Sequence, residues 1–471
     1  MESKKPYFRL ALLFAAVLCA AVLCACAAPA QNAPAEPTAA PAPTAAPTPV
    51  PAIDLGGTEV PADIDALSLA DGSYTVDLLC ASADRFTALN SIELGLTGLS
   101  GAELARITAA YPTAEVTWRT ALLGEEYPSD TAVLDLSALN GEELDAVCEA
   151  LEKLPALRSI NTIPEQGVTT LSFAQLDRLQ AAAPDALLDC RFDLYGQLVS
   201  FDTEELRYSK AGLNNDAVAQ FRAALPYLRA LKLLRVYNSG IDDYDGMLSL
   251  KEDFPEVNIV WSVNIAGYNF MTDTVLFHCP LLRDKHVELL RYLPDVLYLD
   301  VGHNQYLTSI DFVRYFPKLT TIIISITHLS DISALADCPD LEFFEAFSCP
   351  IKDISPLAGL TKLEYVNLGD CPNLQSLAPL RGMTTLKLVR LTGSYPNFAK
   401  NEISDLSESI PDCFVSTYGG HSAFSGYWRF DDQHNYTERY ALLRQQMLYD
   451  IPSWEDRQQN SPTRLPGDRE R

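Results

Sequence analysis

Apolar residues recur at fixed short intervals in the C-terminal half of the chain. From Val296 to Leu391, five nine-residue lines align: VLYLDVGHN, LTTIIISIT, LEFFEAFSC, LEYVNLGDC and LKLVRLTGS. Each line has apolar residues at offsets 0, 3 and 5, and successive lines start 23, 22, 22 and 23 residues apart. A fixed period of about 20 to 29 residues with this spacing predicts a solenoid of stacked coils, each containing one short strand.

The pattern also predicts which side chains enter the coils. Side chains alternate along a strand, so Val366 and Leu368 are expected inside and Tyr365 and Asn367 outside. The residue at offset 8 turns inward where the strand ends and must satisfy backbone groups that lack a ladder partner. Small or polar residues fill this slot in every line: Asn304, Thr327, Cys349, Cys371 and Ser394. A single coil cannot bury both of its faces, so stability is expected from stacking.

Two phrases carry a resemblance to a known family. DISALADCPDLEFF and DISPLAGLTKLEYVNL resemble the internalin-like class of leucine-rich-repeat proteins. The resemblance covers residues 296–400 and implies an α/β leucine-rich-repeat solenoid, with a parallel concave sheet and a helical or irregular convex side. For function the resemblance is a weak signal, because one fold can host many functions.

A longer repeat occupies residues 53–295. Three prolines lie 72 and 71 residues apart, and each is followed six residues later by a bulky or small apolar residue and twelve residues later by glycine. These triplets are Pro112, Trp118 and Gly124; Pro184, Cys190 and Gly196; and Pro255, Trp261 and Gly267. Each unit of about 71 residues is expected to contain a helix, two strands, a helix and a strand.

The simplest interpretation of these degenerate repeats is one continuous solenoid. It would start near the strand from Leu89 to Leu96 and run without a break into Val296. In the middle unit either Leu228 or Leu231 could occupy offset 0 of the repeat. Leu231 fits better, because the small polar residue Ser239 then occupies offset 8.

The N-terminus has the features of an export signal. Lys4, Lys5 and Arg9 precede an apolar run, as in a secretory signal peptide. Leu23-Cys24-Ala25-Cys26 then resembles a bacterial lipobox, which implies a signal peptide at 1–25 and lipid attachment at Cys26. The alternative is an uncleaved transmembrane anchor, because the apolar run continues to about Ala30 and approaches the ~20 residues that a span needs.

The segments at either end of the folded part are also distinct in composition. Residues 26–52 are rich in Ala, Pro and Thr, with eight prolines, and are expected to form an extended stalk of roughly 80 Å at ~3.1 Å per residue. Residues 401–452 are expected to form a cap over the last coil, including a helix from about Glu438 to Tyr449. Residues 453–471 are expected to be a disordered tail.

Charge and motif content restrict the function classes. The chain has 471 residues, 62 acidic against 35 basic ones, and a formal charge of −27, which disfavours binding to nucleic acid. No nucleophile elbow, P-loop, H-E-x-x-H or paired C-x-x-C motif is present, so neither an enzyme, a metal site nor a cofactor is predicted. Cys338 and Cys349 could approach each other, but buried free thiols are the favoured state.

The predicted ligand-binding surface is the concave face of the sheet. Successive strands stand about 4.8 Å apart, so their outward side chains form near neighbours. Exposed aromatic residues ringed by polar groups are enriched at protein interfaces. The alternative is that some of these side chains pack on one another only to stabilise the sheet. The candidate residues are Tyr298, Asp300, His303, Ile323, Phe343, Glu345, Phe347, Tyr365, Asn367, Asp370 and Arg390.

Together these features predict a lipid-anchored leucine-rich-repeat protein on the extracytoplasmic face of a bacterial cell membrane. Its expected partner is another protein or a cell-surface glycan. One alternative is a solute-binding lipoprotein of a transporter, which would need two α/β lobes around a cleft. A wall hydrolase, with Asp300, Glu345 and Asp370 as its carboxylates, is less favoured.

The lipid attachment can be tested directly. Cys26→Ala should leave an unlipidated precursor that keeps residues 1–25, because the thiol that carries the lipid is gone. Mass spectrometry of the N-terminal peptide reports the outcome. An unmodified Cys26 in the mature wild-type protein would contradict the prediction.

Overall fold

The computed structural model describes residues 50–71, 73–165, 167–394, 401–418 and 427–452. The predicted signal peptide (1–25), Cys26, nearly all of the stalk (26–52) and the tail (453–471) lie outside the described residues. Residues Ile53–Arg471 form one compact unit. Among the described residues, no helix is both long enough and apolar enough to cross a membrane.

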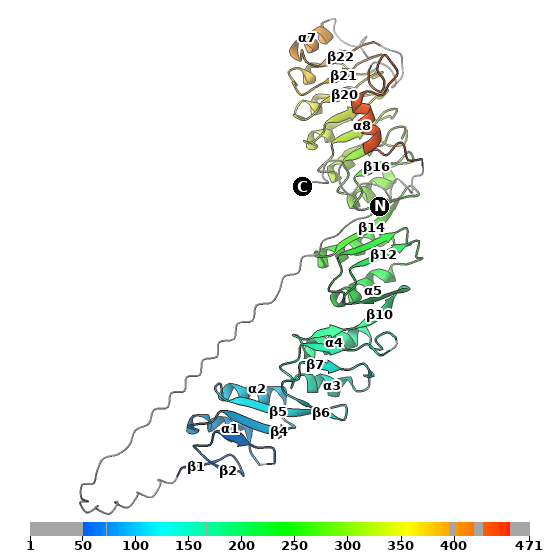
Figure 1. The fold of residues 1–471 in the computed structure, drawn as a ribbon. Coiled ribbons are helices and arrows are strands. Elements are labelled where there is room, and N and C mark those ends of the chain that lie inside the picture. The colour runs from blue at the N-terminus through cyan, green and yellow to red at the C-terminus, as the bar shows by residue number, and fades with distance from the viewer. Residues whose placement is uncertain (1–49, 72, 166, 395–400, 419–426, 453–471) are drawn as a thin grey trace, which may run out of the picture. The chain divides into compact units, whose positions relative to one another are not determined.

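The C-terminal part of this unit is built on a sheet of seven parallel strands that follow one another in chain order (Figure 1). The strands are β16 (Leu276–His278), β17 (Tyr298–Asp300), β18 (Thr321–Ile323), β19 (Phe343–Glu345), β20 (Tyr365–Asn367), β21 (Leu388–Arg390) and β22 (Phe414–Ser416). Short 3-10 helices, and finally one α-helix, connect them. These are η3 (Asp284–Tyr292), η4 (Asp311–Tyr315), η5 (Ser333–Asp337), η6 (Ser355–Leu357), η7 (Ala378–Leu380) and α7 (Glu402–Ser409).

The interior of these coils matches the sequence pattern. The residues at offset 3 are all fully buried and pair in register: Leu299, Ile322, Phe344, Val366 and Val389. The DIS phrases start the connecting 3-10 helices, because Asp331 and Asp353 each accept a hydrogen bond from the backbone N–H two residues on.

The inward slot at offset 8 also behaves as predicted. The Asn304 side chain donates to the carbonyl of Cys279 in the preceding coil (2.7 Å) and to that of Val301 in its own coil (3.0 Å). The Cys371 thiol donates to Ala346 O (3.1 Å), and the Ser394 hydroxyl donates to Leu368 O (2.6 Å). Each slot residue therefore satisfies a carbonyl where the strand ladder stops. All eight cysteines among the described residues are free thiols.

The preceding 220 residues form shorter sheets with helices between their strands. The strands are β1 (Ala52–Asp54), β2 (Glu59–Pro61), β3 (Ala66–Ser68), β4 (Ser91–Leu96), β5 (Glu115–Leu122), β6 (Glu125–Pro128), β7 (Val133–Asp135), β8 (Ser159–Asn161), β9 (Leu187–Asp189), β10 (Arg191–Leu194), β11 (Gln197–Ser200), β12 (Glu205–Ser209), β13 (Leu233–Tyr237), β14 (Asn258–Ile265) and β15 (Tyr268–Met271). The helices are α1 (Val76–Ala81), η1 (Ala83–Arg85), α2 (Gly101–Ala110), α3 (Leu144–Leu151), α4 (Phe173–Ala182), α5 (Asp216–Ala224), η2 (Leu225–Tyr227) and α6 (Tyr244–Asp253).

The periodic glycines of this part form the turns of three β-hairpins. Gly124, Gly196 and Gly267 join β5 to β6, β10 to β11 and β14 to β15. In each turn the residue before glycine also has positive φ, between 50° and 55°, and the glycine has a φ between 83° and 90°. Two consecutive positive φ values are typical of the two-residue type I′ hairpin turn, which favours glycine at the second position.

The continuous solenoid expected from Leu89 to Val296 does not have one continuous sheet. The strands of this part pair as β3–β4–β5–β6, β7–β8–β9 and β12–β13–β14–β15, and the pairing stops at each hairpin. The physical reason is visible at Arg119 of β5, which pairs with Leu96 of β4 on one side and with Pro128 of β6 on the other. The hairpin thus takes the edge that the next coil's strand would need. Apolar packing is nonetheless continuous from Leu194 to Cys413.

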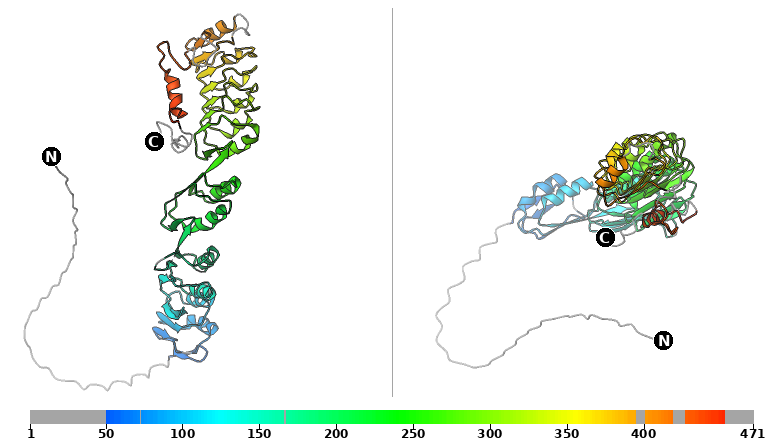
Figure 2. Two further views of the ribbon diagram at one scale, coloured as in Figure 1. Left: turned by 90° about the vertical axis from the view of Figure 1, so that its right-hand side faces the viewer. Right: turned by 90° about the horizontal axis from the view of Figure 1, so that it is seen from above.

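The region expected to be a cap has two parts. Residues up to 418 add one further coil, because α7 and β22 extend the seven-stranded sheet. Residues 427–452, which include α8 (Glu438–Gln446), lie beside the sheet rather than over its end (Figure 2). We call residues 427–452 the strap.

The slot at offset 8 supports a stability prediction. Cys371 is fully buried, and burial raises the pKa of its thiol to about 12, which shows how strongly the site disfavours a charge. Cys371→Asp should therefore lower the free energy of unfolding by several kcal/mol, on the order of ~2–5. Cys371→Asn should be far milder, because Asn304 makes the same kind of hydrogen bonds in an equivalent slot. Equal urea midpoints for the two variants would contradict this placement.

Candidate functional site

The side chains predicted to point out of the coils do so, in two columns that run across the strands. Strand register places Tyr298, Thr321, Phe343, Tyr365 and Leu388 in one column. The second column, two residues further along each strand, is Asp300, Ile323, Glu345, Asn367 and Arg390. We call the surface made by these columns the sheet face.

The expectation that the sheet face is exposed is wrong for most of the predicted residues. Eight of them are between 0% and 8% exposed: Tyr298, Asp300, Ile323, Phe343, Glu345, Phe347, Asn367 and Arg390. Tyr365 and Asp370 are half-buried, and His303 is exposed. At Tyr298, Ile323 and Phe343 the reason is that the strap covers the face, forming an apolar cluster with these residues that is separate from the coil interior. Asp300 and Glu345 lie beneath hydrogen bonds from the strap.

The apolar part of this contact is centred on Phe343. The Trp428 ring of the strap lies 4.9 Å from the Phe343 ring, centroid to centroid. The Arg439 guanidinium lies 4.8 Å from the centroid of Phe343 and 5.6 Å from that of Tyr365, which are cation–π distances. Tyr440, Leu443 and Met447 of the strap complete the cluster.

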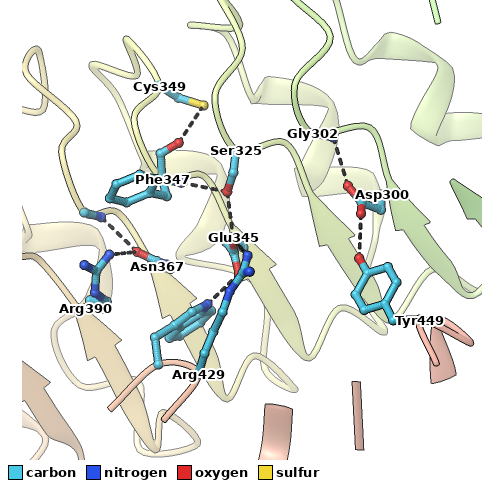
Figure 3. A network of polar contacts seen from close by, with 12 residues as sticks. Asp300, Gly302, Ser325, Glu345, Phe347, Cys349, Asn367, Arg390, Arg429 and Tyr449 are labelled. Carbon is cyan, nitrogen blue, oxygen red and sulfur yellow. Dashed lines mark hydrogen bonds and ion pairs between the residues drawn. The ribbon is translucent and has the colours of Figure 1, made fainter. Parts of the chain in front are cut away.

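A buried carboxylate joins the centre of the sheet face to the strap (Figure 3). Glu345 is fully buried and accepts a hydrogen bond from the Trp428 indole N–H (2.5 Å). Its other oxygen accepts from the Ser325 hydroxyl (2.9 Å) and lies 3.4 Å from the Arg429 guanidinium. Burial alone would lower the pKa of Arg429, but the Glu345 charge raises it. The two side chains therefore depend on each other as partners at this contact.

A second carboxylate joins the strap at the other end of the face. Asp300 accepts hydrogen bonds from the Tyr449 hydroxyl (2.5 Å) and the Gly302 amide (2.9 Å), and it lies 3.0 Å from His278 Nδ1. Burial would raise the pKa of Asp300, but these hydrogen bonds and the His278 charge together hold it below its ordinary value. Burial and the neighbouring Asp300 charge raise the pKa of the Tyr449 phenol, so Tyr449 remains the donor.

The third polar group of the face is Arg390, which is fully buried near the C-terminal end of the sheet. Its guanidinium donates to Asn367 Oδ1 (3.2 Å) and lies 5.2 Å from the centroid of the Phe347 ring. Burial lowers its pKa, and the Glu345 and Asp370 charges oppose that shift. The face thus carries acid, amide and base in adjacent strands.

The carboxylates considered for hydrolysis do not form an open pair. Asp300 and Glu345 are both buried beneath the strap, where Tyr449 and Trp428 hold them. Within the described ranges, no group of three His, Cys, Asp or Glu side chains is arranged to hold a metal ion. What the arrangement can do is recognise a polypeptide through aromatic, cation–π and charge-assisted contacts.

Reasoning from the sequence missed the strap residues that make these contacts, chiefly Trp428, Arg429, Arg439 and Tyr449. The aromatic residues of the segment were assigned to the end of the solenoid, because an exposed terminal coil needs a cover. The available signal was its arginines, since an arginine next to an aromatic residue suits a face with buried carboxylates better than an apolar coil end.

The covered face makes a prediction about two adjacent phenylalanines. Phe343→Ala and Phe344→Ala should each destabilise the protein by about 3–5 kcal/mol, because both rings are buried. Phe414 occupies the column position of Phe343 on β22 but is 45% exposed, so Phe414→Ala is a matched control with a much smaller loss. The measurement is urea unfolding of the three variants. A near-wild-type Phe343→Ala would show that the face is open to solvent.

Comparisons with known proteins add little beyond the fold type. No family model matches the chain, and no curated protein matches it. Among solved structures it is similar to an internalin (inlF) of Listeria monocytogenes, with 14% identity over 72% of this chain and 86% of that chain and a TM-score of 0.27. It is also similar to a leucine-rich-repeat protein of Leptospira interrogans, with 12% identity over 70% of this chain and 90% of that chain and a TM-score of 0.29.

Similarity at this level carries no argument about function. The assignment rests on the chain's own features: parallel strands in register, inward apolar residues at offset 3 and hydrogen-bonded slots at offset 8. The chain therefore has an α/β fold of parallel sheets, and its C-terminal sheet has the arrangement of a leucine-rich-repeat solenoid.

Proposed function

We propose that this chain is a lipid-anchored binding protein on the extracytoplasmic face of a bacterial cell membrane. Its leucine-rich repeats bind another protein, and the sheet face is the contact surface. Anchoring is supported by the sequence alone, through the export signal, Leu23-Cys24-Ala25-Cys26 and the proline-rich stalk that follows. The binding role is supported by the geometry of the sheet face.

The observation that carries the proposal is that the sheet face holds a polypeptide segment. Trp428, Arg429 and Tyr449 are each matched by a sheet-face carboxylate, and Arg439 lies over the Phe343 and Tyr365 rings. Aromatic residues and arginine are the types that dominate protein–protein contacts. A face with these partners is chemically suited to a protein ligand.

Other partners and roles have less support. Aromatic side chains also stack on sugars, so a wall glycan is the second candidate partner, but the segment that the face holds is polypeptide. A solute-binding lipoprotein needs two lobes around a cleft, whereas residues Ile53–Arg471 form one compact unit of successive sheets. The formal charge of −27 disfavours nucleic acid.

The test places a photo-crosslinking residue in the full-length chain in its native membrane. Tyr365, half-buried on the sheet face, is the test position, and Lys362, exposed three residues earlier in the same coil, is the control. We expect a discrete protein adduct from position 365 and none from position 362. Adducts that disappear on digestion with a wall hydrolase would favour the glycan instead. Equal products from both positions, or none from 365, would contradict the proposal.

A further inference from the structure

We propose that the strap is a replaceable occupant of the sheet face. The partner it stands in for is a polypeptide segment that carries an aromatic N–H or O–H donor next to an arginine, as Trp428 and Arg429 do. Such a partner binds by displacing the strap, so that the chain with the strap in place is the closed state. This inference rests on the proposed function and adds the chemistry of the partner and the control of access.

The first argument is the composition of the contact. The strap meets the face through Trp428, Arg429, Arg439, Tyr440 and Tyr449, together with Leu443 and Met447. Trp, Tyr, Arg and Met are the residue types enriched in interfaces between separate proteins. The coil interior on the other side of the same strands is instead Leu, Ile, Val, Phe, Ala and Cys. One side of the sheet thus resembles a core and the other resembles an interface.

The second argument is that the strap has a structure of its own. Its first part closes on itself, because Thr437 N donates to Arg429 O (3.0 Å), and the Phe430 and Tyr436 rings stack at 4.9 Å. Thr437 then caps α8 through a hydrogen bond from the Tyr440 amide. Side-chain hydrogen bonds at Glu345, Thr321 and Asp300 join the strap to the face, and the seven-stranded sheet takes no strand from the described residues of the strap. The strap can therefore leave without breaking a strand ladder.

The third argument is electrostatic. Releasing the strap returns Glu345 and Arg429 to water, and regained hydration offsets much of the lost pairing, since a buried ion pair contributes little net stability. The closed state is also incompletely satisfied. Asn367 Nδ2 and Ser416 Oγ are buried and have no hydrogen-bond partner among the described residues. A segment that offers acceptors there would gain contacts that the strap does not supply.

The strap competes well against a free segment because it is attached to the same chain as the face. Residues 417–426 join it to β22, and a short tether gives an effective concentration in the millimolar range. A free segment with the same contacts therefore binds the wild-type chain weakly. Weakening the strap should tighten binding of such a segment, because less competition has to be overcome.

The first experiment is hydrogen exchange of the full-length chain followed by mass spectrometry. Amides of α8 should exchange through an opening that leaves the amides of β17–β21 protected. Tyr449→Phe and Trp428→Phe remove a donor to a carboxylate while keeping most of the ring, and each should raise strap exchange about ten-fold or more without changing strand exchange. Tyr227→Phe is the matched control, since it also removes a tyrosine–aspartate hydrogen bond, to Asp177, away from the strap. Strap and strands exchanging together in all variants would overturn the inference.

The second experiment uses a synthetic peptide of residues 427–452, the whole strap, as the probe. It should bind the Trp428→Phe, Tyr449→Phe double variant at least about ten-fold more tightly than the wild-type chain. A peptide with Ala in place of Trp428 and Arg429 should bind neither. Equal binding of the two peptides, or no binding by the double variant, would overturn the proposed partner chemistry.

The two proposals can fail separately. A protein adduct at position 365 with a strap that never opens would leave the proposed function standing and remove the displacement. If the strap opens and the double variant binds the peptide, but no adduct forms in the native membrane, the displacement stands and the proposed function is removed.

Discussion

The structure depends on one constraint, which is that no coil of this chain can bury its own apolar side chains. Each coil of the C-terminal part contributes only one three-residue strand, so Phe344 or Val366 is buried only by the coils on either side. Stacking forces the strands into parallel register and places an inward residue at the end of each strand, where Asn304, Cys371 and Ser394 satisfy carbonyls of the preceding coil or their own. The same register aligns the outward residues into columns.

The columns of outward residues need a cover or solvent, because they combine charged and aromatic side chains. Register brings Asp300, Glu345, Asn367 and Arg390 into one line of adjacent strands and sets the aromatic rings of Tyr298, Phe343 and Tyr365 beside it. A surface that is both apolar and charged must either face water or be covered by a segment that supplies apolar contacts and also partners for the charges. The strap does so with Trp428 and Arg429 at Glu345, Arg439 at Phe343 and Tyr449 at Asp300. The chemistry of the strap is therefore complementary to that of the face.

The sequence predicted the parts of the fold that repeat. The strands of the C-terminal coils and their inward slots follow from side-chain alternation, which is local. The spacing also singled out Gly124, Gly196 and Gly267, but not the hairpins that they form. Two expectations failed because their cause is not local. Pairing at Arg119 depends on β6 folding back onto β5 and taking the edge that the next coil's strand would need, and side-chain alternation does not encode that. The burial of Glu345 depends on Trp428, 83 residues away, and that of Asp300 on Tyr449, 149 residues away. Alternation tells which face a side chain occupies, but not what lies against that face.

The central claim is that the strap and the sheet face recognise each other through specific contacts. A double-mutant cycle between Glu345→Gln and Trp428→Phe tests it most directly, with the free energy of unfolding measured for the wild type, both single variants and the double variant. Because the carboxylate and the indole N–H are bonded to each other, we expect the two effects to fall short of additivity by roughly 0.5–3 kcal/mol. Additivity to within about 0.5 kcal/mol would show that the two side chains do not meet, and that the sheet face is free of the strap.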